Sequence, residues 1–427
     1  MPGQQVNVLD LLARRYDGRS FVHLAALALV WLTFASSGLV FSEPCPTDAL
    51  SAALIVLLPA IGLVRIEREL APLLVVFAGA GASGLLSATT AFDIEKATMH
   101  TVVSIFLYGA TFVLAGFVAA KPVAHTRLIF QGLTFASVIA AAAGLIGYFD
   151  LMPGADIFTK FGRASGTFKD PNVFGPFLVP AFLYAIQTAL ERPLKRSFLP
   201  LMLAGFLALG VFLSFSRGAW MNLIAALSIY AVMAFATAGT HARRQKIAIL
   251  ALSGTALVAS VVGGALQIEK VATLVAERAS VAQSYDVGPD GRFGGQEKAF
   301  GLILEHPAGI GAGEFAVIHH HEEPHNVYLS MPLNAGWIGA GLYVMMVGLT
   351  LVFGFIKCFK RSPAQPFLLI ATAAFAANAF EGVIIDTDHW RHFYLLIALV
   401  WGTASAPEMA TARPQIPARA SHRLAMA

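Results

Sequence analysis

Residues 198–238 read FLPLMLAGFLALGVFLSFSRGAWMNLIAALSIYAVMAFATA, and Arg217 is the one charged residue among them. A helix needs about 20 apolar residues to cross a hydrocarbon core that is about 30 Å thick. This sequence therefore predicts two membrane spans, 198–216 and 218–238, which join almost without a loop at Arg217.

The rest of the chain continues this pattern. Of its 427 residues, 57% are hydrophobic and 13% are charged, against about 25% charged in a soluble globular domain. We expect an all-α polytopic membrane protein with about 12 transmembrane helices, the first of which is too long to be the apolar region of a signal peptide. The predicted spans are 21–41, 49–64, 70–88, 101–120, 128–149, 172–190, 198–216, 218–238, 247–266, 336–356, 366–385 and 392–406.

The basic residues predict the orientation of these spans. The two termini and every second loop carry 19 of the 29 Lys and Arg residues, and such residues mark the cytoplasmic side of a membrane protein. Both termini are therefore expected in the cytoplasm. The net charge of +4 is spread thinly over these loops, so it does not indicate a nucleic-acid-binding surface.

Loop lengths divide the chain into four parts. We expect an N-terminal transmembrane bundle of about nine spans at 1–266, a large outer loop with short helices at 267–335, C-terminal transmembrane helices at 336–406 and a cytoplasmic tail at 407–427. Long loops in a compact architecture are usually functional or disordered. Apolar spacing typical of helices at 268–283 and 293–306 favours a folded outer loop.

Several basic residues lie at the predicted outer face. The loop at 150–171 carries Arg163 and Lys169 and enters the next helix near Asn172. Both cations could simply extend to lipid phosphates. An arginine as close to hydrocarbon as Arg217 costs free energy unless it is paired or faces a wet cavity, which favours a ligand contact.

The large outer loop holds Arg292, a glycine run at 309–313 and a histidine and glutamate run at 319–323. The glycines resemble a nucleotide-binding fingerprint only superficially, because no strand precedes them. The histidines and glutamates offer metal-ligand types. Neighbouring residues cannot all face one ion, however, so we interpret them as solvated and expect no metal site.

His325 stands apart from that run. Pro324 suits the first position of a helix, which would place His325 near a helix N-terminus, where the dipole disfavours the imidazolium form. A neutral imidazole beside arginines could accept a proton. A purely structural histidine remains the alternative.

Further along, the last outer turn is flanked by charged residues that we interpret as a salt-bridge network rather than as an acceptor site: Glu381, Asp386, Asp388 and Arg391.

In these motifs the chain resembles the O-antigen ligase and O-antigen polymerase superfamily of bacterial envelope glycosyltransferases. His325-Asn326 with Gly336 and Gly339 fits the family pattern His-Asn-x9-Gly-x-x-Gly. Residues 163–172, RASGTFKDPN, are similar to its Ser-Gly-Thr-Phe…Asn-Pro-Asn segment, with Lys-Asp in place of small residues. Ser216-Arg217-Gly218 and the His-Pro-Ala-Gly run at 306–309 are also similar to the family.

The resemblance implies a GT-C-like enzyme in the bacterial inner membrane, with its active site facing the periplasm. It implies glycan transfer from undecaprenyl pyrophosphate to an acceptor hydroxyl without a metal, a nucleotide sugar or another cofactor. Ligation to lipid A–core is the expected reaction. A polymerase of the same family, a protein-glycosylating member and a transporter or flippase of lipid-linked substrates are the alternatives. The implied partners are the lipid-linked glycan, the acceptor and membrane lipids.

The resemblance also implies roles for individual residues. Arg163, Arg217 and Arg292 would bind the pyrophosphate, with Lys169 as a further contact, because guanidinium forks bind such oxygens bidentately and stay charged. His325 would activate the acceptor hydroxyl. The amides of Asn172 and Asn326 would bind substrate, and Asn326 would orient either the sugar or the histidine.

Overall fold

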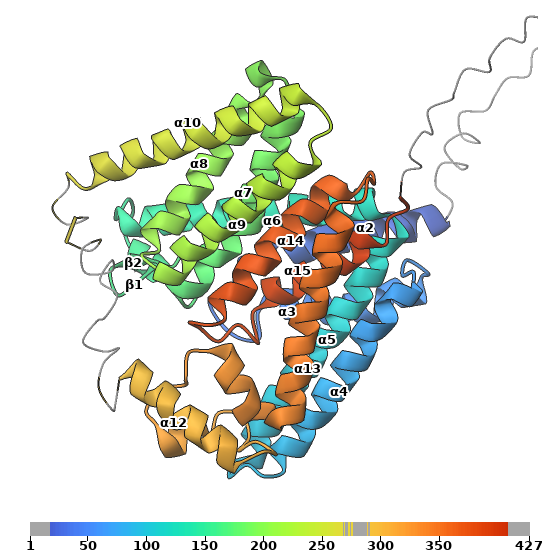
Figure 1. The fold of residues 1–427 in the computed structure, drawn as a ribbon, viewed down its shortest axis with the longest axis vertical. Coiled ribbons are helices and arrows are strands. Elements are labelled where there is room, and N and C mark those ends of the chain that lie inside the picture. The colour runs from blue at the N-terminus through green and yellow to red at the C-terminus, as the bar shows by residue number, and fades with distance from the viewer. Residues whose placement is uncertain are drawn as a thin grey trace, which may run out of the picture.

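The computed structural model describes residues 18–267 and 291–408, and between these ranges residues 269, 272, 273, 275 and 288. Helices make up almost all of it (Figure 1). They are α2 (Gly18–Ala35), α3 (Pro46–Ala60), α4 (Ala71–Ala88), α5 (Ile94–Ala120), α6 (Pro122–Tyr148), α7 (Pro171–Glu191), α8 (Phe198–Leu213), α9 (Arg217–Thr237), α10 (His241–Ala265), α12 (Arg292–Glu305), α13 (Val327–Cys358), α14 (Gln365–Glu381) and α15 (Arg391–Ala404).

Short elements lie in the connections. Two strands, β1 (Thr159–Lys160) and β2 (Arg163–Ala164), pair antiparallel, with Lys160 opposite Arg163. A π-helical turn, η4, spans Phe315–His319. The 3-10 turns are η1 (Arg68–Leu70), η2 (Ala155–Phe158) and η3 (Leu194–Arg196).

Each of the predicted apolar stretches overlaps one of these helices, from α2 to α10 and from α13 to α15. Within the described residues, six segments are long and apolar enough to cross a membrane: 68–88, α5, α6, α7, α9 and α13. The chain is thus an all-α protein of the multi-pass membrane type. The number of spans and their orientation stay predictions.

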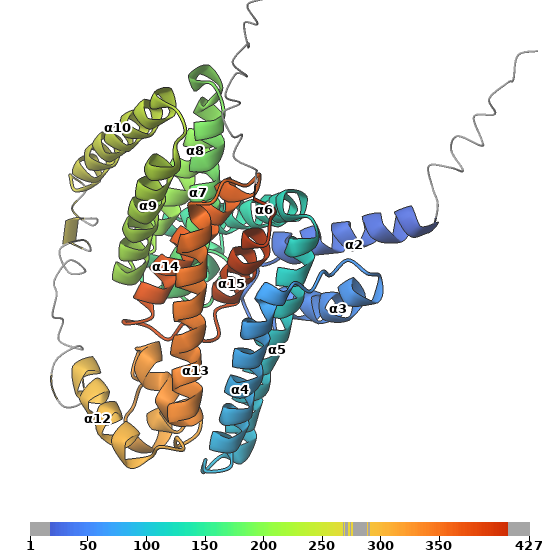
Figure 2. The same cartoon turned by 45° about the vertical axis from the view of Figure 1, so that its right-hand side comes forward.

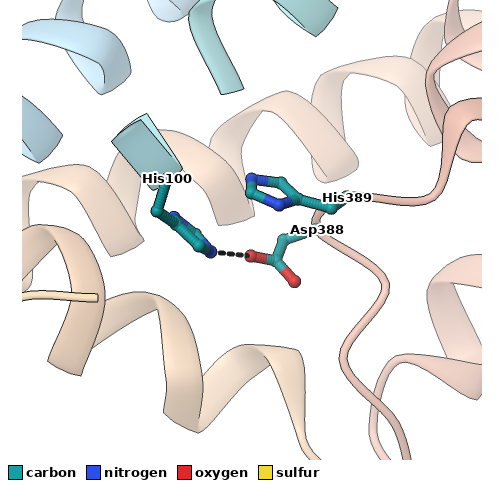
Figure 3. A group of neighbouring side chains, drawn as sticks. All are labelled: His100, Asp388 and His389. Carbon is teal, nitrogen blue, oxygen red and sulfur yellow. Dashed lines mark ion pairs between the residues drawn. The ribbon is translucent and has the colours of Figure 1, made fainter. Parts of the chain in front are cut away.

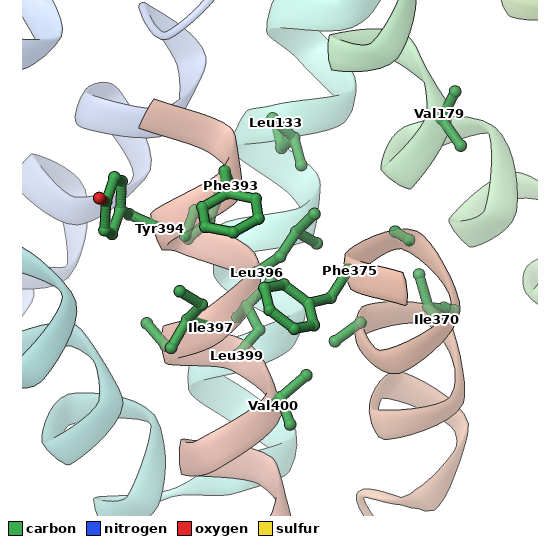
Figure 4. Packing of buried hydrophobic residues seen from close by; sticks show 14 of the residues in the cluster. Leu133, Val179, Ile370, Phe375, Phe393, Tyr394, Leu396, Ile397, Leu399 and Val400 are labelled. Carbon is green, nitrogen blue, oxygen red and sulfur yellow. The ribbon is translucent and has the colours of Figure 1, made fainter. Parts of the chain in front are cut away.

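Helix α15 forms the centre of the packing. It contacts α5, α14 and α13, and every residue from His392 to Ala404 is buried. Figure 4 shows its apolar side chains against Phe375 and Ile370 of α14. A Cβ added to Gly402 would lie 2.5 Å from the Cβ of Val118 on α5. Small residues allow such close approach, which helices in lipid need because burial from water does not drive their association.

We call residues 291–326 the cap. They contain α12 and η4 and lie at the end of the molecule where α4, α5 and α13 project (Figures 1 and 2). The helix expected at 293–306 is confirmed by α12, which packs on α13. The other helix, expected at 268–283, lies almost entirely outside the described residues.

The glycine run of the cap fits into a break in α13. Gly336 has φ 69° and ψ 179° inside this helix, which leaves carbonyls of the preceding turn without helical partners. The amides of Ile310 and Gly311 donate to the carbonyl of Leu333 at 2.8 and 3.2 Å, and the Trp337 amide donates to the Pro307 carbonyl at 2.9 Å. The glycines therefore serve chain packing here. The expected boundary at 335/336 falls on this break, whereas α13 itself begins at Val327.

Candidate active site

Arg163 is a buried residue that joins two connections. Its side chain projects from β2 and the residue is only 7% exposed. Its Nε donates to the carbonyl of Ser214 at 2.7 Å, and its Nη2 donates to Oδ1 of Asn172 at 2.8 Å. The interpretation in which Arg163 extends to lipid phosphates is therefore wrong. It ties the start of α7 to the turn between α8 and α9.

That turn presents Arg217 at the first position of α9. Phe215 has a φ of 45°, a left-handed conformation that non-glycine residues adopt rarely. The hydroxyl of Ser216 then caps the helix by accepting from the Ala219 amide at 3.3 Å. Arg217 is thus fixed at the positive end of a helix dipole, where anions are favoured.

The start of α9 also meets the end of α14. A Cβ added to Gly218 would lie 2.7 Å from Oε1 of Glu381, so only glycine fits here without displacement. Oε2 of this buried carboxyl accepts a hydrogen bond from Nδ2 of Asn222 at 2.7 Å. The Ser-Arg-Gly motif therefore combines a helix cap, a cation and a close contact.

His325 lies just before α13 rather than within it. The helix begins at Val327, and the side chain of Asn326 caps it by accepting from the Tyr328 amide at 3.0 Å. The expectation that Pro324 opens this helix is wrong. His325 itself has a φ of 51°, and its carbonyl accepts from Nη2 of Arg292 at 3.1 Å. Arg292 thus holds the strained backbone of His325.

Two carboxylates flank the imidazole of His325. Its Nδ1 is 3.7 Å from Oδ2 of Asp386, and its Nε2 is 3.6 Å from Oε2 of Glu322. Both distances exceed the usual range for a hydrogen bond, but they allow ion pairing once the ring is protonated. The side chain is 40% exposed, so a substrate can reach it.

The electrostatic surroundings favour a neutral His325. Burial and the charge of Arg292 lower its pKa, and Glu322 and Asp170 act in the opposite direction. The ring is therefore unprotonated at neutral pH, as expected, but the cause is burial rather than a helix dipole. Burial, followed by the charge of Asp388, raises the pKa of Asp386 to about 7, and the hydroxyl of Ser330 donates to its carboxylate.

The predicted site residues thus form two groups. Arg163, Asn172 and Arg217 surround the α8–α9 turn, whereas Arg292, His325 and Asn326 surround the start of α13. The end of α14 lies between the two groups. Its Glu381 contacts the position of Gly218, and the next carbonyl, that of Gly382, accepts from the Val327 amide at 2.9 Å.

A cavity of about 350 Å³ lies beside the second group. Its apolar wall includes Phe106 and Phe177, and its polar wall carries more carboxylates than cations. The charged residues that line it are Glu43, Asp48, Lys169, Asp170, Asp386, Asp388 and Arg391. Asp386 therefore connects this cavity to His325. Of the predicted site residues, Lys169 alone is among those that line it.

The two cations in the cavity wall pair with carboxylates. Nζ of Lys169 lies 3.3 Å from Glu43. Nε and Nη2 of Arg391 donate to the two oxygens of Asp48 at 2.6 and 2.8 Å. The salt-bridge interpretation of the last outer turn holds for Arg391. Asp388 and Asp386 lie at ion-pair distance from His100 and His325, whereas Glu381 accepts a hydrogen bond from Asn222. In the sequence, Asp386 and Asp388 could be recognised as candidate site residues because they lie in a short polar turn between two apolar stretches.

A family model described as O-antigen ligase matches residues 202–344. The match begins within α8 and ends within α13, so it contains Arg217, Arg292, His325 and Asn326 but not Arg163, Lys169 or Asn172. None of the curated proteins compared with the chain matches it. The family match confirms the resemblance on which the roles of these residues were predicted.

Proposed function

We propose that this chain, which a family model of O-antigen ligase matches over residues 202–344, transfers a glycan from undecaprenyl pyrophosphate to an acceptor hydroxyl at the periplasmic face of the inner membrane. The family implies glycosyltransferase activity. We propose lipid A–core as the acceptor. The placement of His325, a neutral imidazole between an arginine-held backbone and two carboxylates, is the observation that carries the proposal.

In this mechanism His325 is the general base. As the acceptor oxygen bonds to the anomeric carbon, its proton passes to the imidazole, while the bond from the anomeric carbon to the phosphate oxygen breaks. The lipid pyrophosphate leaves with that electron pair. Glu322 at 3.6 Å, and Asp386 at 3.7 Å in its ionised form, then stabilise the imidazolium that forms. The proton returns to water before the next cycle.

Arg217 and Arg292 would stabilise the leaving pyrophosphate. Arginine remains charged at every relevant pH and binds phosphate oxygens bidentately. Arg217 also lies at the N-terminus of α9, where the helix dipole favours anions. Because Arg163 donates to Ser214 and Asn172, we assign it and Asn172 to positioning the turn that carries Arg217. Asn326 holds the start of α13, and with it the position of His325.

The cavity suits the acceptor better than the donor. Its carboxylates repel a pyrophosphate but accept hydrogen bonds from sugar hydroxyls. Asp386 lines the cavity and also lies against His325, so a hydroxyl held there is near the base. Lys169 would bind substrate at this wall of the cavity, where it pairs with Glu43.

The proposal is tested in a strain that lacks the gene. Loss of long glycan on lipid A, with the carrier-linked polymer intact, indicates a ligase, whereas accumulation of single carrier-linked repeats indicates a polymerase. We expect His325→Ala and Arg217→Ala to accumulate normally in the membrane but to restore no transfer. His321→Ala and Arg361→Ala are the matched controls and should restore it. Full transfer by both site variants would exclude this mechanism.

A further inference from the structure

Two histidines and an aspartate from distant parts of the chain meet beside the cavity. Figure 3 shows His100 on α5 and Asp388 with His389 on the connection between α14 and α15. One ligand atom from each lies within 4.8 Å of the others. Nε2 of His100 is 3.5 Å from Oδ2 of Asp388, and the two imidazole rings stack with their centroids 4.0 Å apart.

The spacing of these ligand atoms is compatible with an incomplete tetrahedral metal site once the stacked rings turn so that both lone pairs point at one ion. Zinc binds imidazole nitrogen and carboxylate oxygen at about 2.0–2.2 Å, which places tetrahedral ligand atoms about 3.3 Å apart. The separation of His100 and Asp388 is already close to this value. Rotation of the His389 side chain would bring in the third ligand. Three protein ligands leave a fourth position for water, as in many open zinc sites.

The surroundings also suit a cation. The hydroxyl of Ser104 lies 2.9 Å from Nε2 of His389, and metal-bound histidines characteristically have such a partner on the nitrogen that does not bind the ion. With Nε2 bound in this way, Nδ1 is the nitrogen of His389 that remains to bind an ion. Glu323 is close enough to Asp388 to interact electrostatically with it. The charge of Lys96 acts on His100 in the opposite direction and disfavours a further positive charge there.

We propose that His100, Asp388 and His389 bind one divalent transition-metal ion of the zinc class. The ion would fasten the α14–α15 connection, which also carries Asp386, to α5. Its role is structural, and the proposal does not depend on glycosyl transfer. No metal site was expected from the sequence, because neighbouring residues in the run at 319–323 with His325 cannot all face one ion. The three ligands proposed here come together only in the fold.

Metal binding can be measured directly on the purified full-length protein in detergent. After treatment with a chelator, we expect one Zn²⁺ per chain by calorimetry, and one Co²⁺ with the visible absorption of a tetrahedral site. X-ray absorption of the zinc-loaded wild-type protein should show two imidazoles and oxygen ligands. Absence of stoichiometric binding, or a ligand set without two imidazoles, would overturn the proposal.

Variants then locate the ion. His100→Gln and Asp388→Asn should each weaken Zn²⁺ binding at least tenfold and should remove the zinc-dependent rise in Tm. Their Tm in chelator should equal that of the wild type, which shows that they fold. His319→Gln with His321→Gln, on the cap, is the matched control and should bind zinc normally. Loss of binding in this control with full binding in His100→Gln would place the ion at the cap and refute the site.

Discussion

The surroundings of His325, the residue that we propose as the general base, suit proton transfer. A general base must be unprotonated before the reaction, yet its protonated form must be tolerated during it. Burial and Arg292 meet the first condition by lowering the pKa of the ring. Glu322 and Asp386 meet the second, because they lie at ion-pair distance from the ring.

This arrangement predicts the pH dependence of transfer. Activity should rise with pH as the imidazole of His325 loses its proton, with a midpoint below the usual value of 6.5. Glu322→Gln removes a charge that raises this pKa, so the midpoint should move to lower pH. The measurement is kcat/KM of the purified enzyme between about pH 5 and 8. Glu305→Gln, at the end of α12, is the control. An unchanged midpoint in Glu322→Gln would contradict the assignment of the base.

Arg163 has a structural role that a second substitution can test. Arg163→Met leaves the Ser214 carbonyl and the Asn172 amide oxygen without their charged donor, which should cost about 2–5 kcal/mol. Lys160→Met on the paired strand is the control, because its exposed ion pair with Asp170 is worth about 0–1 kcal/mol. Unfolding of both variants in detergent gives the comparison, and equal stability would mean that Arg163 does not hold this junction.

Among the elements, α13 is the one whose course depends most on the rest of the fold. Gly336 takes a conformation that is essentially restricted to glycine, and a Cβ there would lie 2.8 Å from the carbonyl of Ala308. The hydroxyl of Ser83 on α4 donates to the carbonyl of Ala335 at 2.7 Å. The cap thus packs against α13 at this break. The spacing between Asn326 and Gly336 in the family pattern sets the length of the helical segment that precedes the break.

We predict that Gly336→Ala lowers the free energy of unfolding by at least about 1–3 kcal/mol, the cost of the strained backbone alone. Gly341→Ala in the same helix meets nothing within 4 Å and should be neutral or slightly stabilising. Thermal unfolding of the two purified variants measures the difference. A similar Tm for both would show that the break is not needed to seat the cap.

The same helix shows what sequence could predict. Apolar runs of about 20 residues correspond to helices because length and composition are local properties, so a helix at 336–356 was expected and is present. A helix that follows Pro324 was also expected, although 267–335 as a whole was assigned to the outer loop. The break at Gly336 between the two helical segments was not expected, because it depends on contacts with the distant Ser83 and Ile310. The roles proposed for Arg217 and His325 follow from local motifs. The meeting of His100 with Asp388 did not, because nothing near either residue encodes it.

At the scale of the molecule, alternate connections contact one another. Arg391 pairs with Asp48, Arg163 binds Ser214, and His325 lies against Asp386. Similarly, Glu314 of the cap accepts from the Asp93 amide at 2.7 Å. Other contacts join the remaining connections: Lys246 donates to the carbonyl of Ala189 at 2.7 Å, and Lys357 pairs with Glu408 at 3.6 Å. Consecutive helices therefore run between two ends, and the candidate site residues all belong to one of them.

The basic residues predict that the end with the candidate site faces the periplasm, and labelling of introduced cysteines tests this. The native Cys45 and Cys358 are both buried, so they give little background. Phe161, in the loop that carries Arg163, is 78% exposed. A cysteine introduced there by Phe161→Cys should react with a membrane-impermeant maleimide in intact cells whose outer membrane is permeable. Lys195→Cys, in the exposed connection at the opposite end, should react only after the inner membrane is opened. The reverse pattern would put the arginines and His325 in the cytoplasm, away from any lipid A–core acceptor in the periplasm.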